Sequence, residues 1–284
     1  MSDQNSSPLE GGPFSFVRFA RQPFYRAVNE HLVEISEFKP GGAILDLACG
    51  TGEITKLILN RLHGVKNTII IAMDTSNKAL DQARKELAGA KGVMIQFVQG
   101  QAEQLSQTLK GRVDAVVFCN AIHMVDDKPK VLGEIHKVLN PGGILAFNST
   151  FFDGSQLPET DLFYRRWMSK ALRLLKRKHG LLPARDVKVA SRRQLTPEEY
   201  EQLLNQEGFV IKERKLEPVK VTLEGWLGIS EFSDFIQGAL PGVPLAAASE
   251  ALQEAVTQVF QELELEAVPR LWLHVVAAAR PQTT

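Results

Sequence analysis

Residues 43 to 53 give the clearest structural signal in the chain and read Ala43-Ile44-Leu45-Asp46-Leu47-Ala48-Cys49-Gly50-Thr51-Gly52-Glu53. The first half is a short apolar run with one acid, Asp46, which is typical of a parallel strand covered on both faces. Gly50 and Gly52 follow, and glycine allows unusual backbone angles and the close approach of a ligand. A helix beginning at Glu53 would direct its free N–H groups over this turn. The stretch therefore predicts a strand, a glycine turn and a helix that could hold a nucleotide-like cofactor.

Apolar segments and helix-forming segments alternate along the first half of the chain. We expect strands at 43–48, 68–73, 93–98, 113–119 and 143–149, with helices at 53–63, 76–88 and 128–139. Further strands are expected at 209–221 and 271–279. Such alternation predicts an α/β fold, in which a largely parallel sheet carries helices on both faces.

Asp74 ends the second expected strand, where an acid can accept hydrogen bonds from both hydroxyls of a ribose. The other interpretation of Asp74 is a helix N-cap before Ser76. A dinucleotide fingerprint would place a third glycine three residues after Gly52, but the residue there is Thr55. A nicotinamide-dependent oxidoreductase is therefore the less favoured alternative.

Five landmarks in the chain resemble those of the class I S-adenosylmethionine-dependent methyltransferases of small-molecule type. They are, in order, Leu45 to Gly52 as the cofactor loop, Asp74 as the ribose-binding acid, Gly100-Gln101-Ala102-Glu103 as the turn against the adenine, Val113 to His123 as the fourth strand with its loop, and Leu139-Asn140-Pro141-Gly142-Gly143 as the turn into the fifth strand. The resemblance covers about residues 40 to 150 and the last strands. It implies a Rossmann-like, doubly wound, seven-stranded sheet that is mostly parallel, with the last strand antiparallel and with helical cap insertions.

The resemblance also implies S-adenosyl-L-methionine as the cofactor. The residues expected to bind it are Asp46, Ala48, Gly50, Gly52, Asp74, Thr75, Gln101, Ala102 and Asn120. One departure concerns Gln101, because the family most often has an acid at this position. The amide carbonyl of a glutamine can still accept a hydrogen bond from the adenine amine.

Five regions are expected along the chain. They are a disordered N-terminus at 1–12, an N-terminal helical cap at 13–36 interrupted near Pro23, the cofactor-binding core at 37–150, a helical lid insertion at 151–195, and the C-terminal part of the core at 196–284 with a helical insertion at 222–268. In the family, insertions at the last two places usually build the acceptor pocket. Tyr25 in the N-terminal cap either packs in the core or closes over the cofactor, where its ring would favour a sulfonium cation.

Basic residues crowd between Arg165 and Arg193, where the single acid is Asp186. An apolar stripe at helical spacing lies beside them and consists of Phe163, Trp167, Ala171 and Leu174. Three interpretations remain open: a lid helix that leaves its charges in water, a basic rim that captures an anionic acceptor, and a helix at 162–178 that contacts an anionic membrane surface to reach a lipid-like acceptor.

His123 is the candidate catalytic base because it follows the fourth strand, where the acceptor should meet the cofactor. The alternative is that His123 orders the loop or lines the pocket. A sulfonium is already an activated leaving group, so the reaction needs in-line positioning more than it needs a strong catalytic group. A catalytically inactive cofactor-binding partner protein is a third class of function that fits the same motifs.

The composition is that of an ordinary enzyme. The chain has 284 residues, with 33 Lys and Arg against 33 Asp and Glu, so its net charge gives no indication of a nucleic-acid partner. Its two cysteines, Cys49 and Cys119, lie in predicted buried strand ends, and no secretory segment or long apolar run is present, so we expect a cytoplasmic protein. No cluster has metal-ligand spacing, so no metal is expected.

Overall fold

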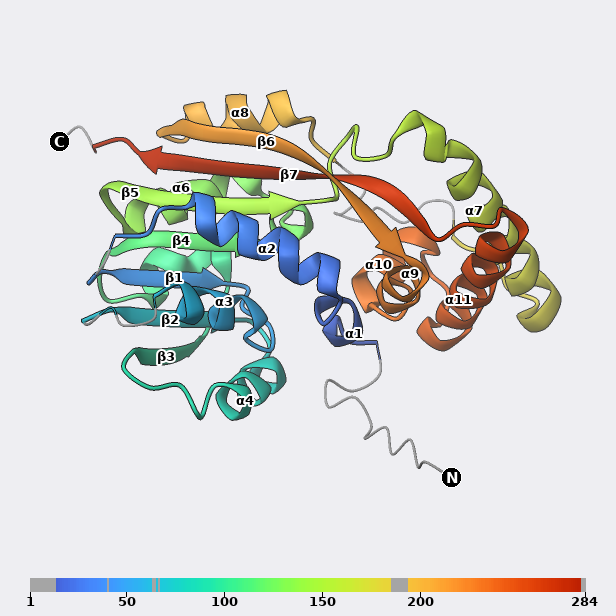
Figure 1. Cartoon of the computed structure of the whole chain (residues 1–284), viewed down its shortest axis with the longest axis horizontal. Helices are drawn as coiled ribbons and strands as arrows, with labels where there is room; N and C mark the ends of the chain where they lie inside the picture. The colour runs from blue at the N-terminus through green and yellow to red at the C-terminus, as the bar shows by residue number, and fades with distance from the viewer. Residues whose placement is uncertain (1–13, 40, 63–64, 66, 185–193, 282–284) are drawn as a thin grey trace.

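The computed structural model describes residues 14–39, 41–62, 65, 67–184 and 194–281, so the N-terminus predicted to be disordered lies outside the described residues. Figure 1 shows a sheet with its flanking helices at one end of the molecule and a group of cap helices at the other. Two long strands, β6 and β7, run from the sheet into the cap.

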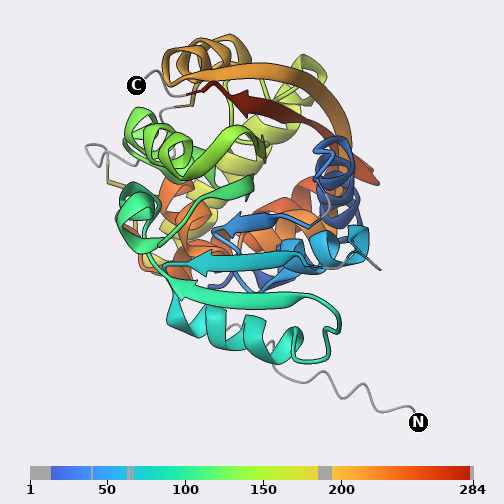
Figure 2. The same cartoon turned by 90° about the vertical axis from the view of Figure 1, so that its left-hand side faces the viewer.

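The sheet has seven strands. They are β1 (Ala43–Leu47), β2 (Ile69–Asp74), β3 (Met94–Gln99), β4 (Val113–Cys119), β5 (Leu139–Ser149), β6 (Phe209–Thr222) and β7 (Ala267–Ala279). Their order is β3-β2-β1-β4-β5-β7-β6, and Figure 2 shows them stacked from β3 at the bottom to β6 at the top. The pairs from β3 to β5 are parallel, whereas β7 is antiparallel to both of its neighbours. The predicted Rossmann-like, doubly wound sheet with an antiparallel last strand is confirmed.

Two strands begin earlier than the sequence predicts. β5 begins at Leu139 because this residue pairs with Val113, and a register shift accommodates the Pro-Gly-Gly turn before pairing resumes at Ile144. β7 begins at Ala267, which pairs with Thr222 at the end of β6. The prediction missed the first part of β7 because a proline and an arginine interrupt the apolar pattern there.

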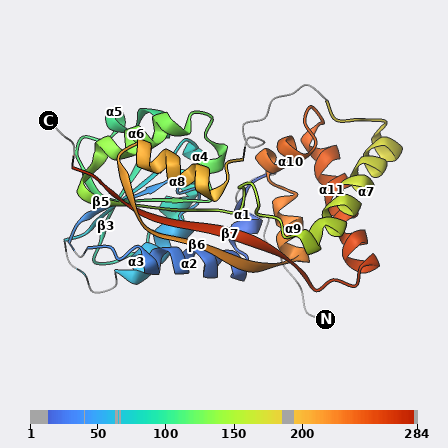
Figure 3. The same ribbon diagram turned by 90° about the horizontal axis from the view of Figure 1, so that it is seen from above.

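Helices cover both faces of the sheet. The helices of this part are α2 (Pro23–Ile35), α3 (Glu53–Arg61), α4 (Asn77–Glu86), α5 (Leu105–Thr108), α6 (Lys128–Val138) and α8 (Pro197–Gln206). Figure 3 shows α2 and α3 on one face and α6 and α8 on the other. Apolar side chains of α2 and α3 pack on Ile44 and Ile70, and those of α6 and α8 pack on Leu45 and Phe147. The alternation of these strand residues between the two faces is what a sheet covered on both sides requires.

Local signals in the sequence set two helix starts. Pro23 occupies the first turn of α2, where its missing N–H costs nothing, and separates α2 from the short α1 (Val17–Ala20). Thr196 and Glu199 form a reciprocal capping box at the start of α8.

The cap consists of α7 (Asp161–His179), α9 (Leu223–Ile229), α10 (Ser233–Ala239) and α11 (Leu245–Glu262), which come from the two predicted insertions. They share one apolar cluster, in which Phe163 and Trp167 of α7 contact the Trp226 ring of α9. Phe19 of α1 belongs to the same cluster, so the N-terminal helices are joined to the cap. Within the described ranges, no helix is long and apolar enough to cross a membrane.

Candidate active site

A cavity of about 840 Å³ lies between the sheet and the cap. Residues that follow β1, β2 and β4 border it on the sheet side, so it opens at the carboxyl ends of the parallel strands. This is where ligands bind in open α/β sheets. Residues of α1, α7 and α10 border it on the other side.

The predicted strand, glycine turn and helix are present at residues 43–61. Ala48, Gly50 and Gly52 all have positive φ, at 58°, 53° and 89°. A Cβ on Gly50 would meet nothing within 4 Å, whereas a Cβ on Gly52 would approach Leu87 at 3.0 Å. Gly50 thus leaves open space above the backbone, and Gly52 allows α3 to start close to the residue that follows α4.

Asp46 lies beneath this turn with 1% of its surface exposed. Its Oδ2 accepts a hydrogen bond from the Thr55 hydroxyl, and Oδ1 has no hydrogen-bond partner in the described part of the chain. Burial raises the pKa of the Asp46 carboxyl to about 7, while the Thr55 hydrogen bond acts in the opposite direction. A buried acceptor without a partner is costly, so Oδ1 is available for a donor or a positive charge on a ligand.

Asp74 ties the glycine turn to the next helix. Its two carboxylate oxygens accept hydrogen bonds from the backbone N–H groups of Gly50 and Ser76, at 2.9 and 2.8 Å. The N-cap interpretation of Asp74 is wrong, because Ser76 is the N-cap of α4 and its hydroxyl accepts from Ala79. Each carboxylate oxygen can accept a second hydrogen bond, so Asp74 keeps capacity for ribose hydroxyls.

The nine predicted cofactor residues divide into two groups. Three of them border the cavity, namely Ala48, Gly50 and Asn120. Six do not border it: Asp46, Gly52, Asp74, Thr75, Gln101 and Ala102. Thr75 and Gln101 are exposed just beyond the carboxyl ends of β2 and β3. Their contacts with a ligand stay predictions.

Asn120 is held by two asparagines that the sequence analysis did not single out. Its N–H donates to the backbone and side-chain oxygens of Asn148, both at 2.9 Å, and its φ is 46°. Asn148 in turn donates to the Asn29 side chain of α2. The signal that could have found them is an asparagine in an otherwise apolar strand, since buried amides are normally hydrogen-bonded.

His123 borders the cavity in a fixed orientation. The Ser149 hydroxyl accepts a hydrogen bond from the Phe151 N–H at 3.0 Å and shares a second hydrogen bond with Nδ1 of His123 at 3.1 Å. The ring lies 4.4 Å from the Phe151 ring. Burial, with the positive charges of Lys128 and Arg270, lowers the pKa of His123 to about 3. The imidazole is therefore neutral at pH 7 and accepts protons weakly.

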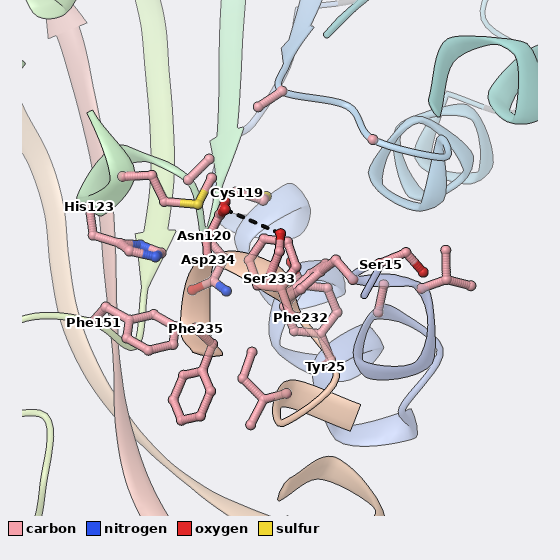
Figure 4. A pocket seen from close by; sticks show the side chains of 18 of the residues that line it. Ser15, Tyr25, Cys119, Asn120, His123, Phe151, Phe232, Ser233, Asp234 and Phe235 are labelled. Carbon is pink, nitrogen blue, oxygen red and sulfur yellow. Dashed lines mark hydrogen bonds between the residues drawn. The ribbon is translucent and has the colours of Figure 1, made fainter. Parts of the chain in front are cut away.

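The cap side of the cavity is mainly aromatic. Figure 4 shows His123 and Phe151 on one wall, with Tyr25 and Phe232 on the opposite wall. Trp167 of α7 stacks on Phe235 with ring centres 5.9 Å apart. The sequence analysis missed Arg270, which is buried and borders the cavity from β7. The part of the sequence around it was not predicted to be a strand.

The basic residues of α7 do not line the cavity as a group. The apolar stripe of the helix is buried, and Tyr164, Trp167 and Met168 are the α7 residues that reach the cavity. Several cations pair with acids of α11: Arg166 and Lys170 with Glu262, and Lys178 with Glu250 and Glu254. Arg185, Lys188, Arg192 and Arg193 lie outside the described residues. A membrane contact through 162–178 stays a prediction. It would involve the outer face of α7, where Leu162 and Leu172 are exposed beside the charges, since the apolar stripe packs inward.

Comparisons with known proteins agree with this geometry. Residues 44–143 match the family model of a methyltransferase domain. The ubiquinone/menaquinone biosynthesis C-methyltransferase UbiE of a Marinomonas species is 30% identical over 156 residues, which cover 53% of this chain and 57% of that protein. The chain thus spans only about half the length of the curated relatives it matches.

Solved structures extend the likeness to most of the chain. The cyclopropane synthase MmaA2 from Mycobacterium tuberculosis has a TM-score of 0.57 at 13% identity, covering 96% of this chain and 100% of its own. YjhP from Escherichia coli has a TM-score of 0.56 at 19% identity, covering 93% and 99%. These similarities show a shared fold.

Fold, glycine turn and domain match together define a class of protein: residues 44–143 form a methyltransferase domain within a Rossmann-like, seven-stranded sheet. The named relatives and structures give no support to a nicotinamide-dependent oxidoreductase.

Proposed function

We propose that this protein transfers the methyl group of S-adenosylmethionine to a small-molecule or lipid-like acceptor. The observation that carries the proposal is the continuity of the cavity, which runs from the glycine turn to the aromatic residues of the cap. One end has the features of a site for the methyl donor, and the other has room for an apolar molecule. UbiE, named for quinone biosynthesis, supports an acceptor of this kind.

The residues present fit the cofactor. Asp46 Oδ1 is a buried acceptor without a partner, and a Cβ at Gly50 would stand in open space. Asp74 already orients its carboxylate at the end of β2, where a ribose is expected. These three residues would hold the cofactor, with Ala48 and Asn120 bordering it.

The cap end supports a bulky apolar acceptor. Phe151, Trp167, Met168, Phe232 and Phe235 border the cavity there. Burial of an acceptor against such side chains contributes about 25 cal/mol for each Å² of apolar surface removed from water. A small polar acceptor would gain little from these walls.

Bound S-adenosylmethionine supplies a methyl group on a sulfonium, which is an activated leaving group. The protein then has to align the acceptor, and alignment of this kind is worth roughly 7–11 kcal/mol of the barrier. The cap helices exclude water from the nucleophile. His123, held by Ser149, orients the loop after β4 at the place where the two ends of the cavity meet.

Binding of S-adenosylhomocysteine and of NAD, followed by thermal unfolding and calorimetry, tests the proposal. We expect S-adenosylhomocysteine to raise the melting temperature and NAD to leave it unchanged. Stabilisation by NAD alone would contradict the proposal. Incubation of phenols, quinols and unsaturated lipids with methyl-labelled S-adenosylmethionine then tests the acceptor. If none of these compounds becomes labelled, the proposed acceptor class is contradicted.

A further inference from the structure

Arg270 is a buried guanidinium in the wall of the cavity, with 6% of its surface exposed. Its Nε donates to the Thr150 carbonyl at 3.0 Å, and Nη2 donates to the Ser155 hydroxyl at 3.2 Å. Within the described ranges, no Asp or Glu lies at ion-pair distance from it. The cavity therefore contains a buried positive charge with no acid to balance it.

Such an arrangement is destabilising, because a buried charge loses its hydration and regains that energy only when it is paired. Burial lowers the pKa of Arg270, but a guanidinium stays protonated. The Phe151 ring, 4.9 Å from the guanidinium carbon, offsets part of the cost through a cation–π contact. Neutral groups and one aromatic ring leave the charge only partly compensated.

The guanidinium also keeps hydrogen-bonding capacity. A guanidinium has five N–H donors in a planar fork. Nε and Nη2 donate to Thr150 and Ser155, and the Tyr164 hydroxyl lies close enough to interact with the guanidinium as well. These three contacts leave further N–H donors of the fork free. A fork with free donors matches the two oxygens of a carboxylate.

The other charged side chains described around the cavity are not buried as Arg270 is. The remaining charged residues that border it, Glu53, Lys78 and Asp234, are partly or fully exposed to water. The basic side chains of α7 that are paired with α11 point to another surface. Arg270 is thus the buried cation of the cavity among the residues that the structure describes.

We infer that Arg270 binds a carboxylate of the acceptor, so that the substrate is an apolar molecule carrying one carboxylate group. This inference rests on the proposed function, because it assumes that the cap end of the cavity holds the acceptor. A carboxylate on the fork would place the apolar body of the acceptor along Phe151, whose ring contacts both Arg270 and His123. The reacting atom then faces the loop after β4.

Calorimetry on the protein saturated with S-adenosylhomocysteine tests the inference. The probes are benzoate, 2-naphthoate and decanoate, each compared with its neutral primary amide. We expect at least one carboxylate to bind ten-fold or more tightly than its amide, and Arg270→Met to reduce this preference to less than two-fold. The matched control is Arg214→Met, since Arg214 pairs with Glu198 and Glu201 on the surface and should keep the full preference.

A second variant covers the case in which Arg270→Met does not fold. Gln156 is exposed and forms an isolated antiparallel bridge with Arg270, so its side chain lies on the same face. Gln156→Glu would add an internal counter-ion, and we expect it to abolish the carboxylate preference while Arg270 remains.

The outcomes separate the two proposals. The inference is overturned if no carboxylate binds more tightly than its amide, or if the preference survives both Arg270→Met and Gln156→Glu. In either case intact binding of S-adenosylhomocysteine leaves the proposed function standing. If the unchanged protein fails to bind S-adenosylhomocysteine, the proposed function and this inference both fail.

Discussion

Thr55 shows how a single residue can distinguish two kinds of cofactor site. A dinucleotide-binding turn needs a glycine there for close packing of helix on strand. Here the Thr55 hydroxyl donates to Asp46 instead and holds one carboxylate oxygen in place beneath the turn. The other oxygen has no hydrogen-bond partner among the described residues. The residue that argued against a dinucleotide therefore fixes the acid beneath the glycine turn.

Replacement of Asp74 by alanine should weaken cofactor binding. The variant loses the expected bonds to the ribose and the two bonds that tie Gly50 to Ser76. A hydrogen bond to a charged group is worth about 1.5–3 kcal/mol, which corresponds to a roughly ten- to hundred-fold loss of affinity. Titration calorimetry with S-adenosylhomocysteine measures it. Asp81→Ala, which removes an exposed acid of α4 paired with Arg84, is the control, and equal affinities for the two variants would place the ribose elsewhere.

His123 should act through orientation and not through proton transfer. Its pKa of about 3 lies below the working pH range, so the ring stays neutral between about pH 5 and 8. We expect His123→Gln to retain methyl transfer within about ten-fold, whereas loss of a general base costs about 10²–10⁴-fold. Rate profiles of both proteins over this pH range provide the measurement. An ionisation near pH 6 that disappears in the variant would assign His123 the role of base.

At the scale of elements, helix α7 owes its position to its apolar stripe and less to its charges. Trp167 is 2% exposed, contacts Phe163, Trp226 and Phe235, and donates to the Leu252 carbonyl. The ion pairs of α7 with α11 are partly exposed, and such pairs contribute little. For residues 161–179 the packing agrees with the first of the three interpretations, a lid helix with a buried apolar stripe, while the anionic acceptor and the membrane contact stay predictions.

Two substitutions in α7 should differ sharply in their effect on stability. Trp167→Ala should lower the free energy of unfolding by about 3–5 kcal/mol, because it leaves a cavity in the cap. Lys170→Ala, which removes an ion pair with Glu262, should lower it by less than about 1 kcal/mol. Urea unfolding of both variants checks the difference. Comparable losses would mean that the ion pairs, and not the packing, hold α7.

The sequence was informative where a pattern is local and repeated. The helical spacing of the apolar residues in α7 and the strands of the sheet could be predicted because neighbouring residues determine them. The start of β7 could not, since Pro269 and Arg270 lie in a strand only through pairing with Lys220 and Val219 of β6, which are 49 and 51 residues earlier in the chain. Arg270 was missed as a site residue for the same reason.

At the scale of the whole molecule, the cavity lies between two structural units. The cofactor end is built by turns of the sheet, whereas α1 and α10 complete the opposite wall. Arg18 of α1 pairs with Glu224 and Glu231 around α9, which joins the N-terminal helix to the cap. Family resemblance predicted the sheet and the glycine turn of the first unit, and the cofactor contacts of its residues stay predictions. For the second unit it predicted only where the insertions fall.

Binding of S-adenosylhomocysteine should slow amide hydrogen exchange in both units. We expect protection in the glycine turn and in α1 and α10, because residues of all three border one cavity. Helix α8 packs on the sheet away from the cavity and should exchange at an unchanged rate. Exchange followed by mass spectrometry gives the answer. Protection confined to the glycine turn would show that the cap does not respond to the ligand.

The way the cap is attached also affects how such a protein could diverge. Both insertions leave and rejoin the sheet at its β5, β7 and β6 edge, whereas the glycine turn and the turn at Asp74 follow β1 and β2. Recombination within 150–196 or 222–267 would therefore exchange the proposed acceptor end of the cavity and leave the proposed cofactor end unchanged. Arg270 lies near the start of β7, at the border of the exchangeable part. A lineage could thus gain or lose charged acceptors by one codon change there.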